Sequence, residues 1–229
     1  MKIKKRISPN FDERALPIDM LLLHYTGMKT GAEALDRMCD PEAKVAAHYC
    51  VEEDGTIFWL VGEDKRAWHA GASCWKGEVD TNSRSIGIEI VNPGHEFGYR
   101  AFPKAQIGAV IRLAREILKD HGIPPAHVLG HSDVAPERKE DPGELFPWEV
   151  LAKKGIGVWP TTDVDPAPLT NTEALTGALQ QFGYDTDNND LAKVVTAFQR
   201  HFMPECIGTD REGGGDGRAL ALLETLNRS

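Results

Sequence analysis

Short apolar runs separated by turn residues predict several strands in the first 150 residues. Five segments carry this pattern: residues 20–25, 48–52, 56–61, 85–91 and 127–129. The first is continuously apolar, which is typical of a strand buried on both faces. The second and third flank Asp54-Gly55, a pair that favours a tight hairpin. The fourth alternates, which places Glu89 on the face opposite its three isoleucines.

Two helices are predicted between these strands. Residues 103–120 carry apolar side chains at intervals of three and four, which gives one apolar stripe along a helix. We expect this helix to end at His121-Gly122, because two prolines follow at once. A shorter helix is predicted over residues 32–38. Strands that alternate with helices indicate an α/β sheet with helices packed on it.

A composition break near residues 155–170 predicts a linker. The stretch GIGVWPTTDVDPAPLT is rich in proline and has few apolar anchors. We therefore expect a large domain over residues 1–155, a linker over 156–170 and a small domain over 171–229. Apolar residues recur at helical spacing in three segments of the small domain: residues 172–182, 191–202 and 217–226. The small domain is thus predicted to be a three-helix unit.

Composition and charge exclude several classes of partner. The net charge of -9 argues against a nucleic-acid partner, because phosphate binding relies on clustered lysine and arginine. No stretch approaches the roughly 20 apolar residues of a membrane span, so no membrane insertion is expected. The basic N-terminus has no apolar stretch behind it, which predicts a cytoplasmic location. The four cysteines lack paired spacing and are expected to be free thiols, and no feature specifies an oligomeric state.

The segment HSDVAPERKEDPG, residues 131–143, gathers chemistry-bearing side chains in a loop-like sequence. His131 and Asp141 are plausible zinc ligands, and Lys139 shares a face with Asp141 if the segment is extended. The best third ligand is His24, near the end of the first apolar strand. Two histidines and one carboxylate, with the fourth position left to water, form a catalytic rather than a structural zinc arrangement.

Such a site suits hydrolysis, because zinc held in this way is a Lewis acid that lowers the pKa of its water to about 7. Lys139 is placed to stabilise an oxyanion, and Glu89 fits the carboxylate that moves the water proton to the leaving amine. For each of these residues an alternative role outside catalysis stays open. His24 could be a hydrogen-bonded core residue, His131 and Asp141 a loop pair, and Glu89 and Lys139 surface charges.

Five segments together resemble the zinc-dependent N-acetylmuramoyl-L-alanine amidases, which are related to phage lysozyme-amidases and peptidoglycan recognition proteins. These segments are LLLHYTG around His24, AAHYCVEEDGTIFWLV at 46–61, AWHAG at 67–71, SRSIGIEIVNPG at 83–94 and HSDVAPERKEDPG. The likeness covers most of residues 18–148 and is strongest to enzymes that process anhydro-muropeptides. It implies a mixed central β-sheet flanked by helices. It also implies hydrolysis of the bond between N-acetylmuramic acid, including its 1,6-anhydro form, and L-alanine of peptidoglycan or muropeptides.

The resemblance also implies roles for individual residues. One zinc ion would be bound by His24, His131 and Asp141, with Glu89 as the catalytic carboxylate and Lys139 polarising the intermediate. Some relatives have a catalytic tyrosine just before the histidine of the AHY segment, and this chain has Ala47 there. The likeness places three residues along the substrate groove: Trp68, His69 and Asn92. Trp68 could equally be a core residue.

The C-terminal segments ALTGALQQFGYD and VVTAFQRHFMP are similar to the three-helix peptidoglycan-binding module of wall hydrolases. The likeness weakens at EGGGDGRALALL, and a helical cap packed on the amidase is the alternative. A wall-binding module favours a periplasmic or wall-associated location, in conflict with the cytoplasmic prediction. Two other functions stay open: a non-catalytic peptidoglycan recognition protein, and a phosphoesterase, which would usually need a second metal and more carboxylates.

Overall fold

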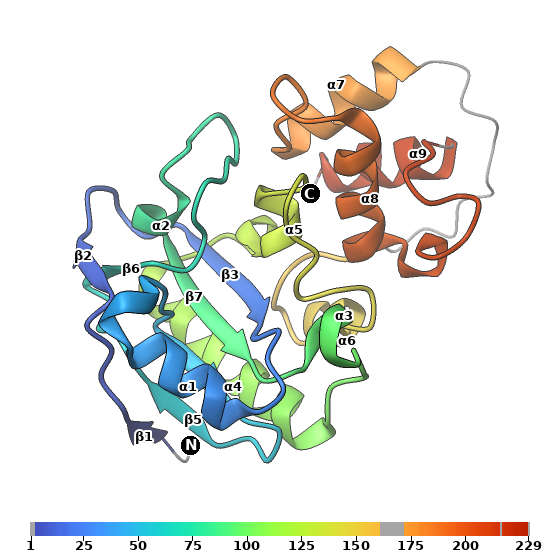
Figure 1. Cartoon of the computed structure of the whole chain (residues 1–229). Coiled ribbons are helices and arrows are strands. Elements are labelled where there is room, and N and C mark those ends of the chain that lie inside the picture. Colours follow the sequence, from blue (N-terminus) through green and yellow to red (C-terminus); the bar gives the residue numbers. More distant parts are fainter. Residues whose placement is uncertain (1–2, 161–171, 216, 229) are drawn as a thin grey trace.

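The computed structural model describes residues 3–160, 172–215 and 217–228, and a six-stranded sheet lies at its centre (Figure 1). The strand order is β1-β5-β4-β7-β3-β8. The strands are β1 (Ile3–Lys5), β3 (Met20–Tyr25), β4 (Tyr49–Val51), β5 (Ile57–Trp59), β7 (Ser85–Ile90) and β8 (Val128–Gly130). Strands β4, β7, β3 and β8 run parallel, whereas β5 is antiparallel to β4. The sheet is therefore mixed, and the predicted fold class is confirmed.

The remaining elements surround this sheet. Strands β2 (Phe11–Glu13) and β6 (Lys65–Ala67) form a separate antiparallel pair. The α-helices are α1 (Gly31–Cys39), α2 (Thr81–Arg84), α3 (Gly94–Phe97), α4 (Lys104–His121), α5 (His131–Val134), α6 (Trp148–Ala152), α7 (Thr172–Phe182), α8 (Leu191–Phe202) and α9 (Gly217–Leu226). Three 3-10 turns are η1 (Pro41–Ala43), η2 (Pro125–His127) and η3 (Pro204–Cys206).

The strongest sequence signals have clear local causes in the structure. In the predicted hairpin, Asp54 Oδ1 accepts a hydrogen bond from Thr56 N at 2.8 Å, and Gly55 adopts a positive φ of 82°. Helix α4 ends at Gly122, whose N–H bonds the carbonyl of Leu118 and whose φ of 65° suits glycine. The two hairpin strands are shorter than predicted, because only three residues of each pair.

The two faces of the sheet bury different side chains. Leu21 and Leu23 of β3 pack with the isoleucines of β7 against α4, which confirms the predicted isoleucine face. Cys50 of β4 points to the opposite face, where it packs with α1. Met20 and Leu22 share that opposite face and pack against the helices at the end of the chain. The face of the sheet that carries Cys50, Met20 and Leu22 is thus covered in two parts, one by α1 and one by α7–α9.

Helices α7, α8 and α9 form a compact unit beside α5, drawn in orange to red in Figure 1. Their bounds match the three predicted helices. The apolar side chains of the unit do not close on themselves alone, because Met20, Leu22, Trp75 and Leu129 belong to the same buried cluster. Ile156, at the start of the predicted linker, is buried against the α4 side of the sheet, and residues 161–170 lie outside the described residues. The division into two domains stays a prediction.

Candidate zinc site

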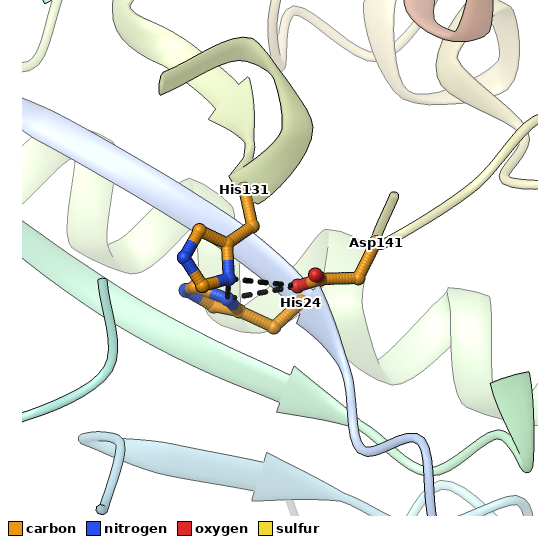
Figure 2. A group of neighbouring side chains, drawn as sticks. All are labelled: His24, His131 and Asp141. Carbon is orange, nitrogen blue, oxygen red and sulfur yellow. Dashed lines mark hydrogen bonds and ion pairs between the residues drawn. The ribbon is translucent and has the colours of Figure 1, made fainter. Parts of the chain in front are cut away.

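Three side chains from distant parts of the sequence converge at the carboxyl end of β3 (Figure 2). His24 comes from β3 itself, His131 begins α5 directly after β8, and Asp141 follows in the next turn. His24 Nδ1 lies 3.0 Å from His131 Nδ1, and each of these atoms lies 3.1 Å from Asp141 Oδ2. Parallel β3 and β8 bring the two histidines together, since both chains leave the sheet at the same edge.

The donor set fits a zinc ion. A tetrahedral zinc with ligands at about 2.0–2.2 Å holds its ligand atoms roughly 3.3–3.5 Å apart, close to the separations of His24, His131 and Asp141. All three side chains are buried, with exposed fractions of 1%, 3% and 5%. Two imidazoles and one carboxylate leave a fourth position open toward the neighbouring cavity. Within the described ranges this is the one group of three such residues close enough to share an ion.

The protonation states of the cluster suit metal binding. Burial, together with the neighbouring His131, lowers the pKa of His24 to about 4, which keeps this imidazole neutral. Burial alone would raise the pKa of Asp141, but the imidazoles of His131 and His24 hold it well below its ordinary value. A metal ion requires neutral histidines and an ionised carboxylate. The site therefore offers its ligands in the form that zinc accepts.

Glu89 lies on β7 directly beside His24, its partner in the parallel register. Burial raises the pKa of Glu89 well above its ordinary value, and the charge of Asp141 acts in the same direction. Its Oε2 atom is buried and accepts no hydrogen bond from the part of the chain that is described. A buried carboxylate oxygen without a partner is costly, which is typical of an atom that meets a ligand or a water molecule.

A cavity of about 640 Å³ opens beside the cluster. Glu89, His131, Lys139 and Asp141 all line it. The positive charge of Lys139 lies near enough to oppose burial in setting the pKa of Glu89. The structure thus brings six of the eight predicted residues to one place, because His24 contacts His131 and Asp141 and His69 also lines the cavity.

The three predicted substrate contacts have different surroundings. His69 lines the cavity, but it is buried behind His24, and its Nδ1 lies 3.1 Å from His24 Nε2. The side chain of Asn92 is buried and bonds backbone groups of Arg100 and Gly94. Trp68 is half-buried at the end of β6, and neither Trp68 nor Asn92 is among the described residues that line the cavity. The substrate contacts of these three residues stay predictions.

Helix α8 forms part of the cavity wall, which the sequence did not predict. Lys193, Thr196 and Arg200 of α8 line the cavity. A guanidinium nitrogen of Arg200 lies 3.6 Å from Glu140 Oε1, while its Nε is buried and has no partner among the described residues. The adjacent basic residues Arg200 and His201 near the end of the apolar stripe of α8 were the available signal. The helical unit therefore contributes directly to the surroundings of the site.

Tyr25 and His95, which also line the cavity, belong to an aromatic cluster that was not predicted. Tyr25 Oη lies 3.0 Å from His95 Nδ1, and the His95 ring stacks on Tyr99 at 4.3 Å. His95 Nε2 lies 3.2 Å from Glu144, whose carboxylate raises the pKa of His95. The position of Tyr25, directly after His24 in the HYTG sequence, was the one local hint to this cluster.

A buried carboxylate joins the helical unit to the segment that carries His131. Asp133 lies two residues after His131 and accepts hydrogen bonds from Tyr184 Oη at 2.6 Å and from Gly130 N at 2.7 Å. His201 Nδ1 lies 2.8 Å from the same carboxylate, and the His201 ring stacks on Trp148 at 3.8 Å. Two side chains of the helical unit thus meet the turn from β8 into α5, which positions a candidate ligand.

Comparison with known proteins identifies this architecture. The sequence profile of the N-acetylmuramoyl-L-alanine amidases matches residues 14–144. The amidase AmiD of Escherichia coli is 36% identical over 231 residues, which cover 90% of this chain and 83% of AmiD. A solved complex of that AmiD with the substrate anhydro-N-acetylmuramic acid-L-Ala-D-γ-Glu-L-Lys superposes with a TM-score of 0.83, at 33% identity, covering 96% of this chain and 97% of that chain.

Two further relatives extend the comparison. The structure of AmpDh3 from Pseudomonas aeruginosa gives a TM-score of 0.80 at 32% identity, covering 97% of this chain and 95% of that one. The 1,6-anhydro-N-acetylmuramyl-L-alanine amidase AmpD of Haemophilus influenzae is 33% identical over 162 residues, which cover 62% of this chain but 86% of AmpD. The likeness to AmiD and AmpDh3 thus extends over nearly the whole fold. With its mixed sheet and its profile match, this chain belongs to the N-acetylmuramoyl-L-alanine amidase family.

Proposed function

We propose that this protein hydrolyses the amide bond between N-acetylmuramic acid and L-alanine in muropeptides, with one zinc ion held by His24, His131 and Asp141. The 1,6-anhydro form of the sugar is included, because AmiD is solved with such a substrate. The observation that carries the proposal is the convergence of the three ligand atoms to within 3.1 Å beside an open cavity. When bound, zinc would act as a Lewis acid that activates water and polarises the amide carbonyl.

Glu89 is the general base in this proposal. Its Oε2, which has no hydrogen-bond partner among the described residues, accepts a proton from the attacking water, and its raised pKa lets it hold that proton and return it to the alanine nitrogen. A bond forms between the water oxygen and the carbonyl carbon, and the carbon–nitrogen bond breaks. The products are the carboxylate of the muramic acid and a peptide with a free L-alanine amine.

Lys139 stabilises the negative charge that develops on the carbonyl oxygen. It lines the same cavity as Glu89, and its ammonium group is a strong donor to an oxyanion. Helix α8 supplies a second cationic wall through Lys193 and Arg200. A γ-linked glutamate keeps a free α-carboxylate, so a stem peptide containing one would suit this wall. In the proposal, the helical unit thus takes part in binding peptidoglycan fragments.

Product analysis by mass spectrometry tests the proposed function. Zinc-loaded protein would be incubated with soluble anhydro-muropeptide and, in parallel, with intact peptidoglycan sacculi, each with and without a chelator. We expect chelator-sensitive release of a stem peptide that begins with L-alanine from the soluble substrate. Release from sacculi as well would extend the substrate class to the intact wall.

A protein that binds peptidoglycan without turnover is the remaining alternative. It would release no stem peptide from either substrate while still retaining muropeptide in a binding assay. The cluster of His24, His131 and Asp141 and the neighbouring Glu89 all favour the enzyme, because a binding protein has no need of a buried general base.

A further inference from the structure

Two consecutive residues, His69 and Ala70, meet the second ring nitrogens of both histidine ligands. His24 Nε2 lies 3.1 Å from His69 Nδ1, and His131 Nε2 lies 2.9 Å from the carbonyl oxygen of Ala70. The Nδ1 atoms of both ligands face Asp141. One short segment therefore contacts both imidazoles on the side away from the metal position.

The direction of each hydrogen bond follows from the atoms at the ends. The carbonyl of Thr81 can only accept, so the hydroxyl of Ser85 donates to it. Ser85 Oγ is then an acceptor for His69 Nε2, which lies 3.3 Å away and carries the proton of the neutral ring. His69 Nδ1 is left as an acceptor, so His24 Nε2 donates to it. His24 Nδ1 consequently carries no proton and presents its lone pair to the metal.

His131 reaches the same state by a shorter route. The carbonyl of Ala70 can only accept and lies 2.9 Å from His131 Nε2, so this nitrogen carries the proton and donates it. The guanidinium of Arg138 is farther from His131 Nε2, at 3.4 Å, and donates to the Ala70 carbonyl itself. His131 Nδ1 is then free for the metal. Both ligands are thus held in the same tautomer, one through an imidazole and one through a backbone carbonyl.

The fold makes specific room for this segment. A Cβ atom at Gly87 of β7 would lie 2.5 Å from the ring of His69, so only glycine lets the imidazole reach His24. The side chain of Asn82 holds the segment in place, because its Oδ1 accepts hydrogen bonds from the N–H groups of His69 and Ala70 at 3.1 and 2.7 Å. These contacts are buried and leave the His69 ring fully engaged with protein atoms.

We propose that His69 and Ala70 form an orienting pair that fixes both ligand imidazoles with Nδ1 toward the metal, and that Ser85 and Asn82 hold this pair. His69 is thus a positioning residue that acts through His24, in place of the substrate contact predicted from the sequence. The inference rests on the proposed zinc site. Partners of this kind typically change metal affinity by about 10–100-fold when they are removed.

The zinc affinities of three variants, measured by competition with a chelating dye, test the orienting pair. His69→Phe keeps a ring but removes both nitrogens, and we expect zinc binding to weaken by about 10–100-fold. His69→Gln restores one acceptor and one donor, so its affinity should return toward that of the wild type. Ser85→Ala removes the acceptor for His69 Nε2 and should cause a smaller loss. His127→Gln is the matched control, because His127 is a hydrogen-bonded histidine, with the carbonyl of Asp19 as its partner, and it lies outside the cavity lining.

Nitrogen-15 NMR of histidine-labelled wild-type protein gives a readout that a purely structural role would not move. We expect His24 and His69 to be protonated at Nε2 and unprotonated at Nδ1, in the apo protein and with zinc. A His69 ring protonated at Nδ1 would overturn the inference, and this spectrum needs no variant to fold. A folded His69→Phe protein that binds zinc within about threefold of the wild type, well short of the expected loss, would also overturn it.

The two proposals fail in different ways. A wild-type protein that binds no zinc would refute the proposed function. If the wild type binds zinc and releases stem peptide, but His69→Phe binds zinc as tightly as the wild type, the orienting pair alone would be refuted.

Discussion

The sheet edge around His24 and the helical unit α7–α9 are built from different kinds of sequence information. At the sheet edge, His24 meets His131 and Asp141, which lie more than 100 residues later in the chain, because the parallel strands β3 and β8 end at the same edge. In the helical unit, each helix follows from apolar residues at local spacing, and the helices then pack on one another. The comparison teaches that local patterning suffices to predict the three helices of the unit, whereas the chemistry depends on the topology of the sheet.

The two regions nevertheless meet at one buried carboxylate. Asp133 follows the candidate ligand His131 and receives Tyr184 and His201 from the helical unit. AmpD of Haemophilus influenzae aligns with less than two thirds of this chain but with most of its own length. The likeness to this relative therefore does not need the whole of this chain.

The largest expected effect lies in the sheet region. Asp141→Ala removes the carboxylate between the two imidazoles, so we expect loss of bound zinc together with loss of stem-peptide release. Metal content by mass spectrometry and product assay on one preparation would measure both. Asp12→Ala is a suitable control, since Asp12 lies in an exposed ion pair with Arg66. A zinc-replete, active Asp141→Ala protein would remove Asp141 from the ligand set.

The second expected effect separates chemistry from metal binding. Glu89→Gln keeps the size of the side chain but removes the base, so zinc should stay bound while kcat falls by about 10²–10⁴-fold. Glu52→Gln is the control, because burial also raises the pKa of Glu52, which lies outside the cavity lining. Near-normal turnover by Glu89→Gln would assign the proton transfer to another group.

The third effect tests how firmly the helical unit is joined to the sheet. Tyr184→Phe removes only the hydroxyl that donates to Asp133, and the buried carboxylate oxygen then lacks that partner. We expect the free energy of unfolding to fall by about 1–3 kcal/mol. Thr176→Ala, on the exposed side of α7, should change it little. Denaturant unfolding of the full chain measures both variants.

The number of unfolding transitions also tests how firmly the helical unit is joined to the sheet. A shared buried cluster predicts one unfolding transition for the sheet and the helical unit. Two separate calorimetric transitions, with Tyr184→Phe shifting neither, would show that the unit is an independent module.

The smallest expected effect is a change in the pH dependence of stability, caused by His95 at the rim of the cavity. The Glu144 carboxylate raises the pKa of His95 above 6.5, so the folded protein keeps this proton longer than the unfolded chain. The stabilisation is complete below pH 6.5 and is lost as pH rises through the raised pKa. His95→Gln should therefore flatten the decline in stability above pH 6.5, by less than about 1 kcal/mol because the pair is partly exposed.

A second histidine gives the opposite sign and serves as the control. Burial lowers the pKa of His127, so its contribution to stability rises as pH increases toward 6.5. His127→Gln should remove that rise. If both variants change the thermal stability in the same direction with pH, the assignment of the rim pair would be wrong.

Much of the fold was predictable, for identifiable reasons. The run at residues 20–25 and the alternation at 85–91 are strong signals because both segments are buried, and the structure has strands there. Strands β1, β2 and β6 carried no such signal, because they are three residues long and mostly exposed or half-buried. Residues 131–134 looked like a loop but form the short helix α5.

The site was predictable only in part. His24, His131 and Asp141 were candidate ligands from their side-chain chemistry, and the family resemblance supported them as one set, since spacing alone cannot bring residues 24 and 131 into contact. The positions of His69 and Arg200 depend on tertiary packing: His69 needs the space above Gly87, and Arg200 needs α8 to lie against the cavity. No local pattern encodes either of these contacts.

A zinc titration of the metal-free full-length protein tests the central claim most directly. Bound zinc and the rate of L-alanyl peptide release from anhydro-muropeptide would be measured on the same samples. The account predicts that both rise together and saturate at one zinc per chain, with no rise in Asp141→Ala. Full activity before zinc is added, or zinc bound without any peptide release, would contradict it.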